Sequence, residues 1–306
     1  MILADHPAEV ATRSPAGPSQ VPSGVGDRAY GGEGETMAER TPEPDHLLEI
    51  AVDVARAAAR TAAEMRRAGV SGLATKSTAT DVVTAADRAV ERQAVAALRE
   101  RRPTDSVLGE EYGDSAPAGG RVRWILDPID GTVNYLYGLP NYAVSLAAEV
   151  DGQVVAGVVR NAATGAEWTA VRGGGAYRDG QRLAGSDQSE LAQALVATGF
   201  GYHSARRVHQ AQVLVGLIPH VRDIRRFGAA AIDLCLAAEG QVDAYFEKGL
   251  NPWDHAAGGL VAEEAGLLVA GLAGAPVGPQ MVVAAPPALF PALQGHLIRL
   301  DAAGGP

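Results

Sequence analysis

Two aspartates follow an apolar segment closely enough to bind one metal ion together. Asp127 and Asp130 come after Trp124-Ile125-Leu126, and Gly131 and Thr132 follow them. Like charges this close are costly unless a cation joins them. Oxygen ligands suit Mg²⁺, which keeps water ligands and accepts substrate phosphate. If a helical turn begins after Gly131, its free N–H groups face an incoming phosphate.

The same segment has a second interpretation, which its residues alone do not exclude. Asp, Pro and Gly favour turns, so residues 127–131 could equally form an ordinary surface turn. Pro128 cannot donate a backbone hydrogen bond, and we expect the preceding strand to stop there. Further acidic residues elsewhere in the chain would favour the metal site over the surface turn.

Three such residues stand near predicted element boundaries. Glu110 follows a short apolar segment, and Asp87 lies at the start of a predicted helix. Asp254 follows Trp253 at the start of another helix, where an isolated Asp is better explained as an N-cap. Gathered in one place, these carboxylates could bind metal ions that neutralise charge during phosphate ester hydrolysis, a very slow reaction without catalysis.

Four segments, in this order and spacing, resemble the inositol monophosphatase family. They are Asp81-Val82-Val83-Thr84-Ala85-Ala86-Asp87, Gly109-Glu110-Glu111, the run from Trp124 through Asp127-Pro128-Ile129-Asp130-Gly131-Thr132 to Tyr135, and Trp253-Asp254. The third segment is highly specific, and the resemblance covers residues 47–283. It implies a layered α/β fold and a phosphomonoesterase activity.

The resemblance also implies a set of metal ligands. Glu110, Asp127 and the Ile129 carbonyl would hold a first Mg²⁺, and Asp127, Asp130 and Asp254 would hold a second. Glu110 would also face a third, weaker site. The expected cofactor is therefore two to three Mg²⁺ ions per active site.

Water and substrate positions follow from the same resemblance. Thr132 and Asp87, with Glu110, would orient the attacking water, so no covalent intermediate is needed. The expected substrate contacts are Asp130, Gly131, Thr132, Ala230, Glu247 and Asp254. Phosphatases with an Asp nucleophile in an Asp-x-Asp motif fit poorly, because Asp127 and Asp130 are three residues apart.

The resemblance implies hydrolysis of a small phosphorylated polyol, first of all myo-inositol 1-phosphate. Histidinol phosphate, fructose 1,6-bisphosphate and 3′-phosphoadenosine 5′-phosphate remain alternative substrates. Ala229 stands where the family usually has Ser or Thr, and Asn161-Ala162 replaces a common Asn-Pro or Asp-Pro pair. These departures leave the metal ligands in place and bear on substrate preference. A regulatory module that binds RNA or transcription factors through the same fold is the alternative of another class.

Composition limits the partners of the chain. The formal net charge of −10 opposes non-specific binding to nucleic acid or anionic membranes. No apolar run reaches the roughly 18 residues of a membrane span, and we see no signal peptide. The single cysteine, Cys235, lies in an apolar helical run and is expected to be buried. We expect a cytoplasmic protein, and the family resemblance adds lithium inhibition and a homodimer.

Residue patterns predict the elements that must position these side chains. Residues 1–44 are rich in Pro, Gly, Ser and Glu and are expected to be disordered, with Met37 as a hypothetical translation start. Apolar residues three and four positions apart predict helices over 47–65, from Thr84 with a capping box, and over 208–217, 229–238 and 254–265. Strands are predicted at 122–126, 142–150, 154–160, 168–172, 195–199, 243–246, 267–269 and 281–284, with 222–227 extended. Asp151-Gly152, between the second and third of these strands, predicts a hairpin.

The element order predicts an α/β fold layered α-β-α-β-α. An antiparallel sheet with helices, over residues 45–186, would hold the metals. A smaller and mostly parallel α/β half, over residues 187–306, would contact the substrate. The active site is expected between the two halves.

Overall fold

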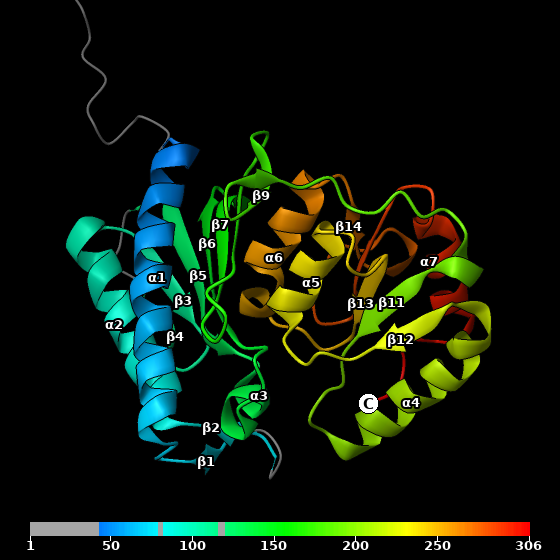
Figure 1. The fold of residues 1–306 in the computed structure, drawn as a ribbon, viewed down its shortest axis with the longest axis horizontal. Helices are drawn as coiled ribbons and strands as arrows, with labels where there is room; N and C mark the ends of the chain where they lie inside the picture. Colours follow the sequence, from blue (N-terminus) through cyan, green and yellow to red (C-terminus); the bar gives the residue numbers. More distant parts are fainter. Residues whose placement is uncertain (1–42, 79–81, 116–119) are drawn as a thin grey trace, which may run out of the picture. The chain divides into compact units, whose positions relative to one another are not determined.

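Helices and two sheets alternate in five layers in the computed structural model (Figure 1), which describes residues 43–78, 82–115 and 120–306. This is the predicted α-β-α-β-α order. The described residues form one compact unit. Disorder was predicted for residues 1–44; residues 1–42 and the hypothetical start at Met37 lie outside the described residues, whereas Pro44 is already the first residue of a helix.

The first helical layer consists of α1 (Pro44–Ala68) and α2 (Ala85–Arg101). Leu47, Ala51, Val54 and Ala58 form the buried face of α1, at the predicted spacing. Both helices pack on one face of the first sheet (Figure 1). A two-stranded ladder of β1 (Ala74–Thr75) and β2 (Val82–Val83) connects them.

Eight strands form the first sheet, in the order β10-β9-β8-β7-β6-β5-β3-β4. All neighbouring pairs are antiparallel except β3 and β5. The strands are β3 (Ser106–Gly109), β4 (Gly113–Ser115), β5 (Val122–Asp130), β6 (Ala143–Val150), β7 (Gln153–Asn161), β8 (Glu167–Val171), β9 (Gly175–Arg178) and β10 (Gln181–Arg182). Asp151 and Gly152 join β6 to β7 with φ angles of 51° and 81°, which confirms the predicted hairpin.

The strand predicted to stop at Pro128 continues to Asp130. Asp127 pairs with Ser145 and Asp130 with Ala143, so β5 advances three residues where β6 advances two. This register shift is a β-bulge, which accommodates a proline that cannot donate to the ladder. The strand therefore resumes after Pro128, and the expected stop is wrong.

The middle layer contains α5 (Ala230–Ala238) and α6 (Pro252–Glu264), which lie between the two sheets (Figure 1). One side packs on the first sheet through Ile232 and Leu260. The other side packs on the second sheet through Leu234 and Ala262. Cys235 is buried within α5, as predicted.

The second sheet has the order β12-β11-β13-β15-β14. Its strands are β11 (Leu195–Thr198), β12 (Asp223–Arg225), β13 (Ala244–Glu247), β14 (Leu268–Ala270) and β15 (Val282–Ala285). The expectation of a mostly parallel half holds only for β12-β11-β13, because β15 is antiparallel to both of its neighbours. The connection through α6 does make β14 run in the direction of β13, but the return strand β15 inserts between them.

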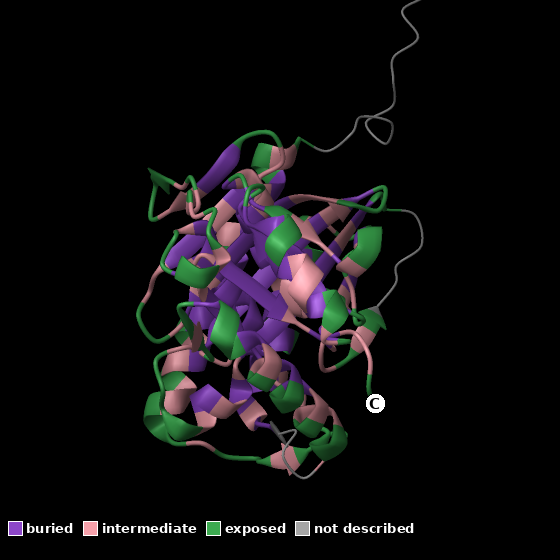
Figure 2. Cartoon of the chain, turned by 90° about the vertical axis from the view of Figure 1, so that its right-hand side faces the viewer, coloured by how far each residue is buried: buried purple, intermediate pink, exposed green. Residues whose placement is uncertain are grey.

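The fifth layer is formed by α4 (Ser204–Leu217) and α7 (Phe290–Arg299), which cover the outer face of the second sheet. Figure 2 shows buried residues concentrated in the interior and exposed residues on the outer turns. Within the described ranges, no helix is long and apolar enough to cross a membrane. The predicted division after residue 186 falls between the two sheets and stays a prediction.

Candidate active site

A cavity of about 450 Å³ opens where ends of elements from both sheets meet. It is lined by all but one of the residues predicted for the site: Glu110, Asp127, Ile129, Asp130, Gly131, Thr132, Ala230, Glu247 and Asp254. The exception, Asp87, contacts Thr132 through a hydrogen bond. The structure therefore brings together residues that lie more than 140 positions apart in the chain.

The β-bulge of β5 aims two carboxylates toward the cavity. Asp127 and Asp130 are 2% and 7% exposed. The Ile129 N–H donates to Asp127 Oδ1 at 3.0 Å. The Ala230 and Ala231 N–H groups donate to the Asp130 carboxylate at 3.2 and 2.8 Å, so Asp130 binds the first turn of α5. A side chain from the first sheet is thus tied to a helix of the middle layer.

Gly131 makes the turn from β5 into the short helix α3 (Thr132–Tyr137). Its φ of +86° is unfavourable for other residues, and a Cβ there would lie 2.8 Å from the Asn141 carbonyl oxygen. The helical turn predicted after Gly131 is present. Gly131 and Thr132 both line the cavity.

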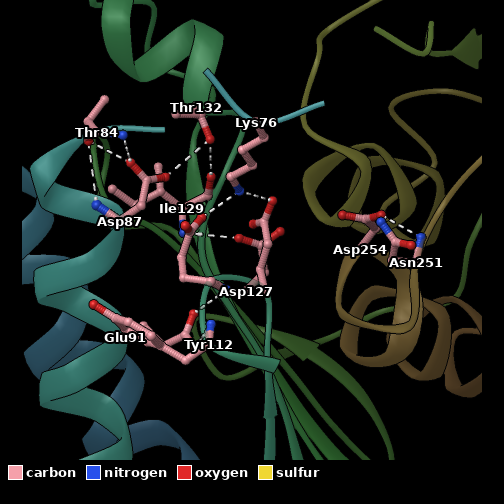
Figure 3. A network of polar contacts seen from close by, with 12 residues as sticks. Lys76, Thr84, Asp87, Glu91, Tyr112, Asp127, Ile129, Thr132, Asn251 and Asp254 are labelled. Carbon is pink, nitrogen blue, oxygen red and sulfur yellow. Dashed lines mark hydrogen bonds and ion pairs between the residues drawn. The ribbon is translucent and has the colours of Figure 1, made fainter. Parts of the chain in front are cut away.

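Asp87 is held by the predicted capping box of α2 (Figure 3). Its Oδ2 accepts hydrogen bonds from the Thr84 N–H at 2.8 Å and the Thr84 hydroxyl at 2.5 Å. Its Oδ1 lies 3.2 Å from the Thr132 hydroxyl, which is equally close to the Ile129 carbonyl oxygen. Burial raises the pKa of Asp87 although the Thr84 hydrogen bonds oppose that shift. A buried carboxyl of raised pKa beside a hydroxyl is suited to accept a proton.

Glu110 lies on the turn between β3 and β4, beside a lysine. The Lys76 ammonium donates to Glu110 Oε1 at 2.7 Å and to Glu111 Oε1 at 2.5 Å (Figure 3). Burial alone would lower the pKa of Lys76, but the two carboxylates raise it. Lys76 therefore remains charged and places a cation among the acidic groups.

Asp254 reaches the cavity from the other side, on the first turn of α6 (Figure 3). It is the third helical residue, and its Oδ2 accepts the Asn251 N–H at 2.6 Å. The N-cap is Asn251, so the ordinary explanation of Asp254 as an N-cap is wrong. The helix instead uses a capping box, which fixes the Asp254 carboxylate at its N-terminus.

The gathered carboxylates disfavour one another's charges. Burial, followed by the charges of Glu110, Asp130 and Asp254, raises the pKa of Asp127 well above its ordinary value. Burial and Glu110 do the same for Asp254. Burial also raises the pKa of Asp130 to about 7, although the Ala231 N–H opposes the shift. Such mutual repulsion in a pocket is relieved when a cation binds.

The donor chemistry of the cavity fits Mg²⁺ ions. Every acidic ligand offers oxygen, the donor that Mg²⁺ prefers, and the cavity leaves room for water and phosphate. Among the described residues, no three His, Cys, Asp or Glu side chains are already close enough to form a metal cage. In the described residues, the carboxylates thus line one cavity without forming a cluster of three that is already arranged around one metal position.

Glu247 and Ala230 form the predicted substrate side of the cavity. The Tyr245 hydroxyl donates to Glu247 Oε2 at 2.7 Å, and burial raises the pKa of Glu247 to about 6. Glu247 keeps Oε1 for a further hydrogen bond. The Ala230 N–H is used by Asp130, and Ala229 lines the cavity without a hydroxyl.

Arg206, Arg226 and His203 were not assigned to the site from the sequence. All three line the cavity. The loop Gly199-Phe200-Gly201, which follows β11, could have indicated this side of the cavity, because loops after strand ends often form binding sites. His209 instead contacts the Asp301 carbonyl oxygen at 2.8 Å.

Residues 43–299 match the model of the inositol monophosphatase family. An inositol-1-monophosphatase from Mycobacterium leprae is 45% identical over 248 residues, which are 78% of this chain and 85% of that protein. A Nus factor SuhB from Pseudomonas aeruginosa is 38% identical over 232 residues, which are 73% of this chain and 86% of that protein. The solved structure of Mycobacterium tuberculosis SuhB has a TM-score of 0.74 at 40% identity and covers 86% of this chain and 100% of its own.

Proposed function

The chain belongs to the inositol monophosphatase family and is a phosphoric monoester hydrolase, and on that premise we propose that it hydrolyses myo-inositol 1-phosphate with Mg²⁺. One observation carries the proposal: Glu110, Asp127, Asp130 and Asp254, from the β3–β4 turn, β5 and α6, line one cavity. Because these carboxylates repel one another, cations are the ligands that the cavity favours most.

We assign the metal ligands residue by residue. One Mg²⁺ would be held by Glu110, Asp127 and the Ile129 carbonyl. A second would be held by Asp127, Asp130 and Asp254, and a third would be faced by Glu110. Bound Mg²⁺ supplies an activated water and stabilises the charge of the leaving oxygen. Each of these ligands already lines the cavity.

The chain's own groups would then handle the water and its proton. The Thr132 hydroxyl can donate to Asp87 while accepting a hydrogen bond from a water in the cavity. Asp87 cannot rotate away because Thr84 binds its other oxygen twice. The pair would therefore orient the water and offer a carboxylate to its proton, together with Glu110, which lines the same cavity.

Substrate binding would use both walls of the cavity. The N–H groups of Gly131 and Thr132 would bind phosphate oxygens, near Asp130 and Asp254. Glu247 would accept a hydrogen bond from a polyol hydroxyl, and the Ala230 region would line the ring. Ala229 offers no hydroxyl, so substrates that need a donor at that point should be poor.

A phosphate-release assay tests the proposal. Purified protein with Mg²⁺ should release phosphate from myo-inositol 1-phosphate faster than from histidinol phosphate, fructose 1,6-bisphosphate or 3′-phosphoadenosine 5′-phosphate. EDTA should stop turnover and added Mg²⁺ should restore it. Equal turnover with EDTA rejects the metal assignment, and a different best substrate rejects the inositol phosphate assignment alone.

Three finer properties belong to the same proposal. We propose inhibition by lithium, a homodimer and a cytoplasmic location. Lithium titration of the phosphatase assay, sedimentation equilibrium and fractionation of cells that express the protein test them separately.

A regulatory role with RNA or a transcription factor is the second candidate, because the similar protein from Pseudomonas aeruginosa carries the name Nus factor SuhB. The formal charge of −10 opposes RNA binding in the absence of a local basic surface. A gel-shift titration with labelled RNA at physiological salt separates the candidates. Tight binding that survives Asp127→Asn would support the regulatory role, and no shift would reject its RNA form.

A further inference from the structure

We propose that Glu91 is a positioning residue that sets the direction of the Glu110 carboxylate toward the metal site. This inference rests on the proposed function, since it concerns one of the proposed Mg²⁺ ligands. Glu91 lies on α2, outside the cavity, and is only 1% exposed. It therefore acts through the turn that carries Glu110 and does not touch substrate.

Both carboxylate oxygens of Glu91 bind the turn that follows β3 (Figure 3). The Glu111 N–H donates to Glu91 Oε2 at 2.8 Å, and the Tyr112 N–H donates to Oε1 at 3.1 Å. Two successive backbone donors on one carboxylate define the orientation of the turn, because hydrogen bonds to a charged acceptor are short and strong. The residue immediately before this pair is Glu110.

The other side of Glu110 is fixed as well. Its N–H donates to the Leu126 carbonyl oxygen at 3.3 Å, which joins the turn to β5. Gly109 allows Glu91 to approach, since a Cβ at that position would overlap the Glu91 carboxylate. The backbone of Glu110 is thereby held between β5 and α2.

The Glu110 side chain has a separate contact. Its Oε1 accepts from the Lys76 ammonium, which also binds Glu111. Lys76 thus acts on the two side chains, whereas Glu91 acts on the backbone. The two contacts are independent and can be tested independently.

Glu91 is a charged residue on an otherwise apolar helix face. It lies on the buried face of α2 with Val90, Ala94 and Leu98, and an apolar side chain there would leave the Glu111 and Tyr112 N–H groups without their acceptor. Burial raises the pKa of Glu91, although the Glu111 and Tyr112 N–H groups oppose that shift. The positive charge of Lys76 also favours the charged form of Glu91, but the hydrogen bonds of its carboxylate go to the two backbone donors of the turn that carries Glu110.

Two substitutions at this position separate positioning from stability. Glu91→Gln keeps the shape and one acceptor oxygen but turns an amide NH₂ toward the second backbone N–H. Glu91→Ala removes both acceptors. Side chains that orient a ligand typically change metal affinity by about 10–100-fold when substituted. We expect Mg²⁺ affinity, measured by calorimetry on the purified protein, to fall by about tenfold or more in Glu91→Ala and by less in Glu91→Gln.

The kinetic readout should match the binding readout. The Mg²⁺ concentration for half-maximal turnover should rise in both variants, while KM for the phosphate ester at saturating Mg²⁺ stays within about twofold. Thermal unfolding in EDTA reports stability separately. Because Glu91→Gln keeps one acceptor and removes a buried charge, its midpoint temperature should fall less than that of Glu91→Ala, while its Mg²⁺ affinity falls below wild type.

Glu100→Gln is the matched control, because Glu100 is an exposed residue of the same helix. It should leave Mg²⁺ affinity unchanged. If Glu91→Ala does not fold, Glu91→Gln carries the comparison. Wild-type Mg²⁺ affinity in a folded Glu91 variant overturns the positioning role alone. A wild-type protein that binds Mg²⁺ but releases no phosphate overturns the proposed function alone.

Discussion

Asp127 is the residue on which the proposed metal site depends most. It would bind both principal Mg²⁺ ions, and its pKa is raised by burial and by the neighbouring carboxylates. Its Oδ1 accepts a local hydrogen bond from the Ile129 N–H at 3.0 Å, and an Asn side chain keeps an oxygen that can accept it. Charge and structure can therefore be separated at this position.

Asp127→Asn should lower kcat by about a hundredfold or more, the size of effect seen when one positioned electrostatic group is lost. Circular dichroism should match wild type, and the unfolding midpoint in EDTA at neutral pH should be at least as high, because the substitution removes a charge that burial and its neighbours disfavour. Asp151→Asn, at an exposed hairpin position with the left-handed φ that Asn tolerates, is the control. Turnover within threefold of wild type in the Asp127 variant would contradict the assignment.

Arg226 tests the substrate wall at the same scale. It lines the cavity, and its positive charge lowers the pKa of Glu247 against the larger effect of burial. Arg226→Ala should raise KM for the phosphate ester about three- to tenfold with little change in kcat. The reason is that a positive charge on the cavity wall attracts the phosphate of the substrate and of the transition state equally.

Arg225 is a close control for Arg226. It is the next residue, but its guanidinium pairs with Asp223 at 2.6 Å and does not line the cavity. Arg225→Ala should leave KM unchanged. Equal effects from the two variants would mean that general surface charge, and not a cavity contact, attracts the substrate.

Among the elements, the join between β5 and α3 combines two constraints at Gly131. Its φ is +86°, and a Cβ would meet the Asn141 carbonyl oxygen at 2.8 Å. Gly131→Ala should therefore cost both conformational strain and steric overlap, together about 2–4 kcal/mol of unfolding free energy. The shift of Thr132 that follows should lower kcat as well.

Gly152→Ala isolates the strain component. Gly152 has a similar φ of +81° with nothing near its would-be Cβ, and it lies on the β6–β7 hairpin. It should cost about 1–2 kcal/mol and leave kcat unchanged. Chemical denaturation and phosphate release, measured on both variants, check the difference. Equal losses of unfolding free energy in the two variants would show that neighbouring atoms shift to relieve the overlap at Gly131.

Local patterns predicted the elements that are defined by neighbouring residues. The Thr84 capping box, the Asp151-Gly152 turn and the helix after Gly131 depend on a few adjacent residues, and all three are present. The passage of β5 through Pro128 and the insertion of β15 between β13 and β14 depend on partners far along the chain. Such pairings leave no local signature, since tertiary contacts override propensity.

The residues of the candidate site also divide into those that a local motif predicts and those that only the fold brings to the cavity. Asp127, Asp130 and Thr132 lie in one short specific motif and were predicted together with the more distant Asp254, and all four line the cavity. Arg206 was not found, because a single arginine in a loop is ordinary until the fold brings that loop to the cavity. Glu91 gave a weak signal, a charged residue on the apolar face of a helix, which sequence reasoning did not use.

For the whole molecule, the gathered carboxylates make stability depend on pH and metal together. The raised pKa values of Asp127, Asp130 and Asp254 mean that the folded chain binds more protons than the unfolded chain. In EDTA, stability should therefore fall as pH rises above the ordinary value near 3.8 and through about 7, the pKa of Asp130.

The midpoint temperature in EDTA should be lower at pH 8 than at pH 5 by about 3 °C or more. Saturating Mg²⁺ should raise the midpoint most at pH 8, because the cation binds the charged carboxylates of the folded state. Asp130→Asn, which cannot titrate there, should flatten the curve measured in EDTA. A midpoint that rises with pH in EDTA would contradict the electrostatic account.

Three carboxylates of the site also hold the N-terminal turns of helices. Asp87 and Asp254 complete the capping boxes of α2 and α6, and Asp130 accepts two N–H groups of α5. Substitutions there would reduce cellular abundance as well as turnover, whereas Asp127 binds no helix terminus. In a mutational library scored by protein abundance alone, substitutions at these three positions would lower abundance as structural substitutions do. Substitutions of Asp127 would leave abundance unchanged, although they should lower turnover.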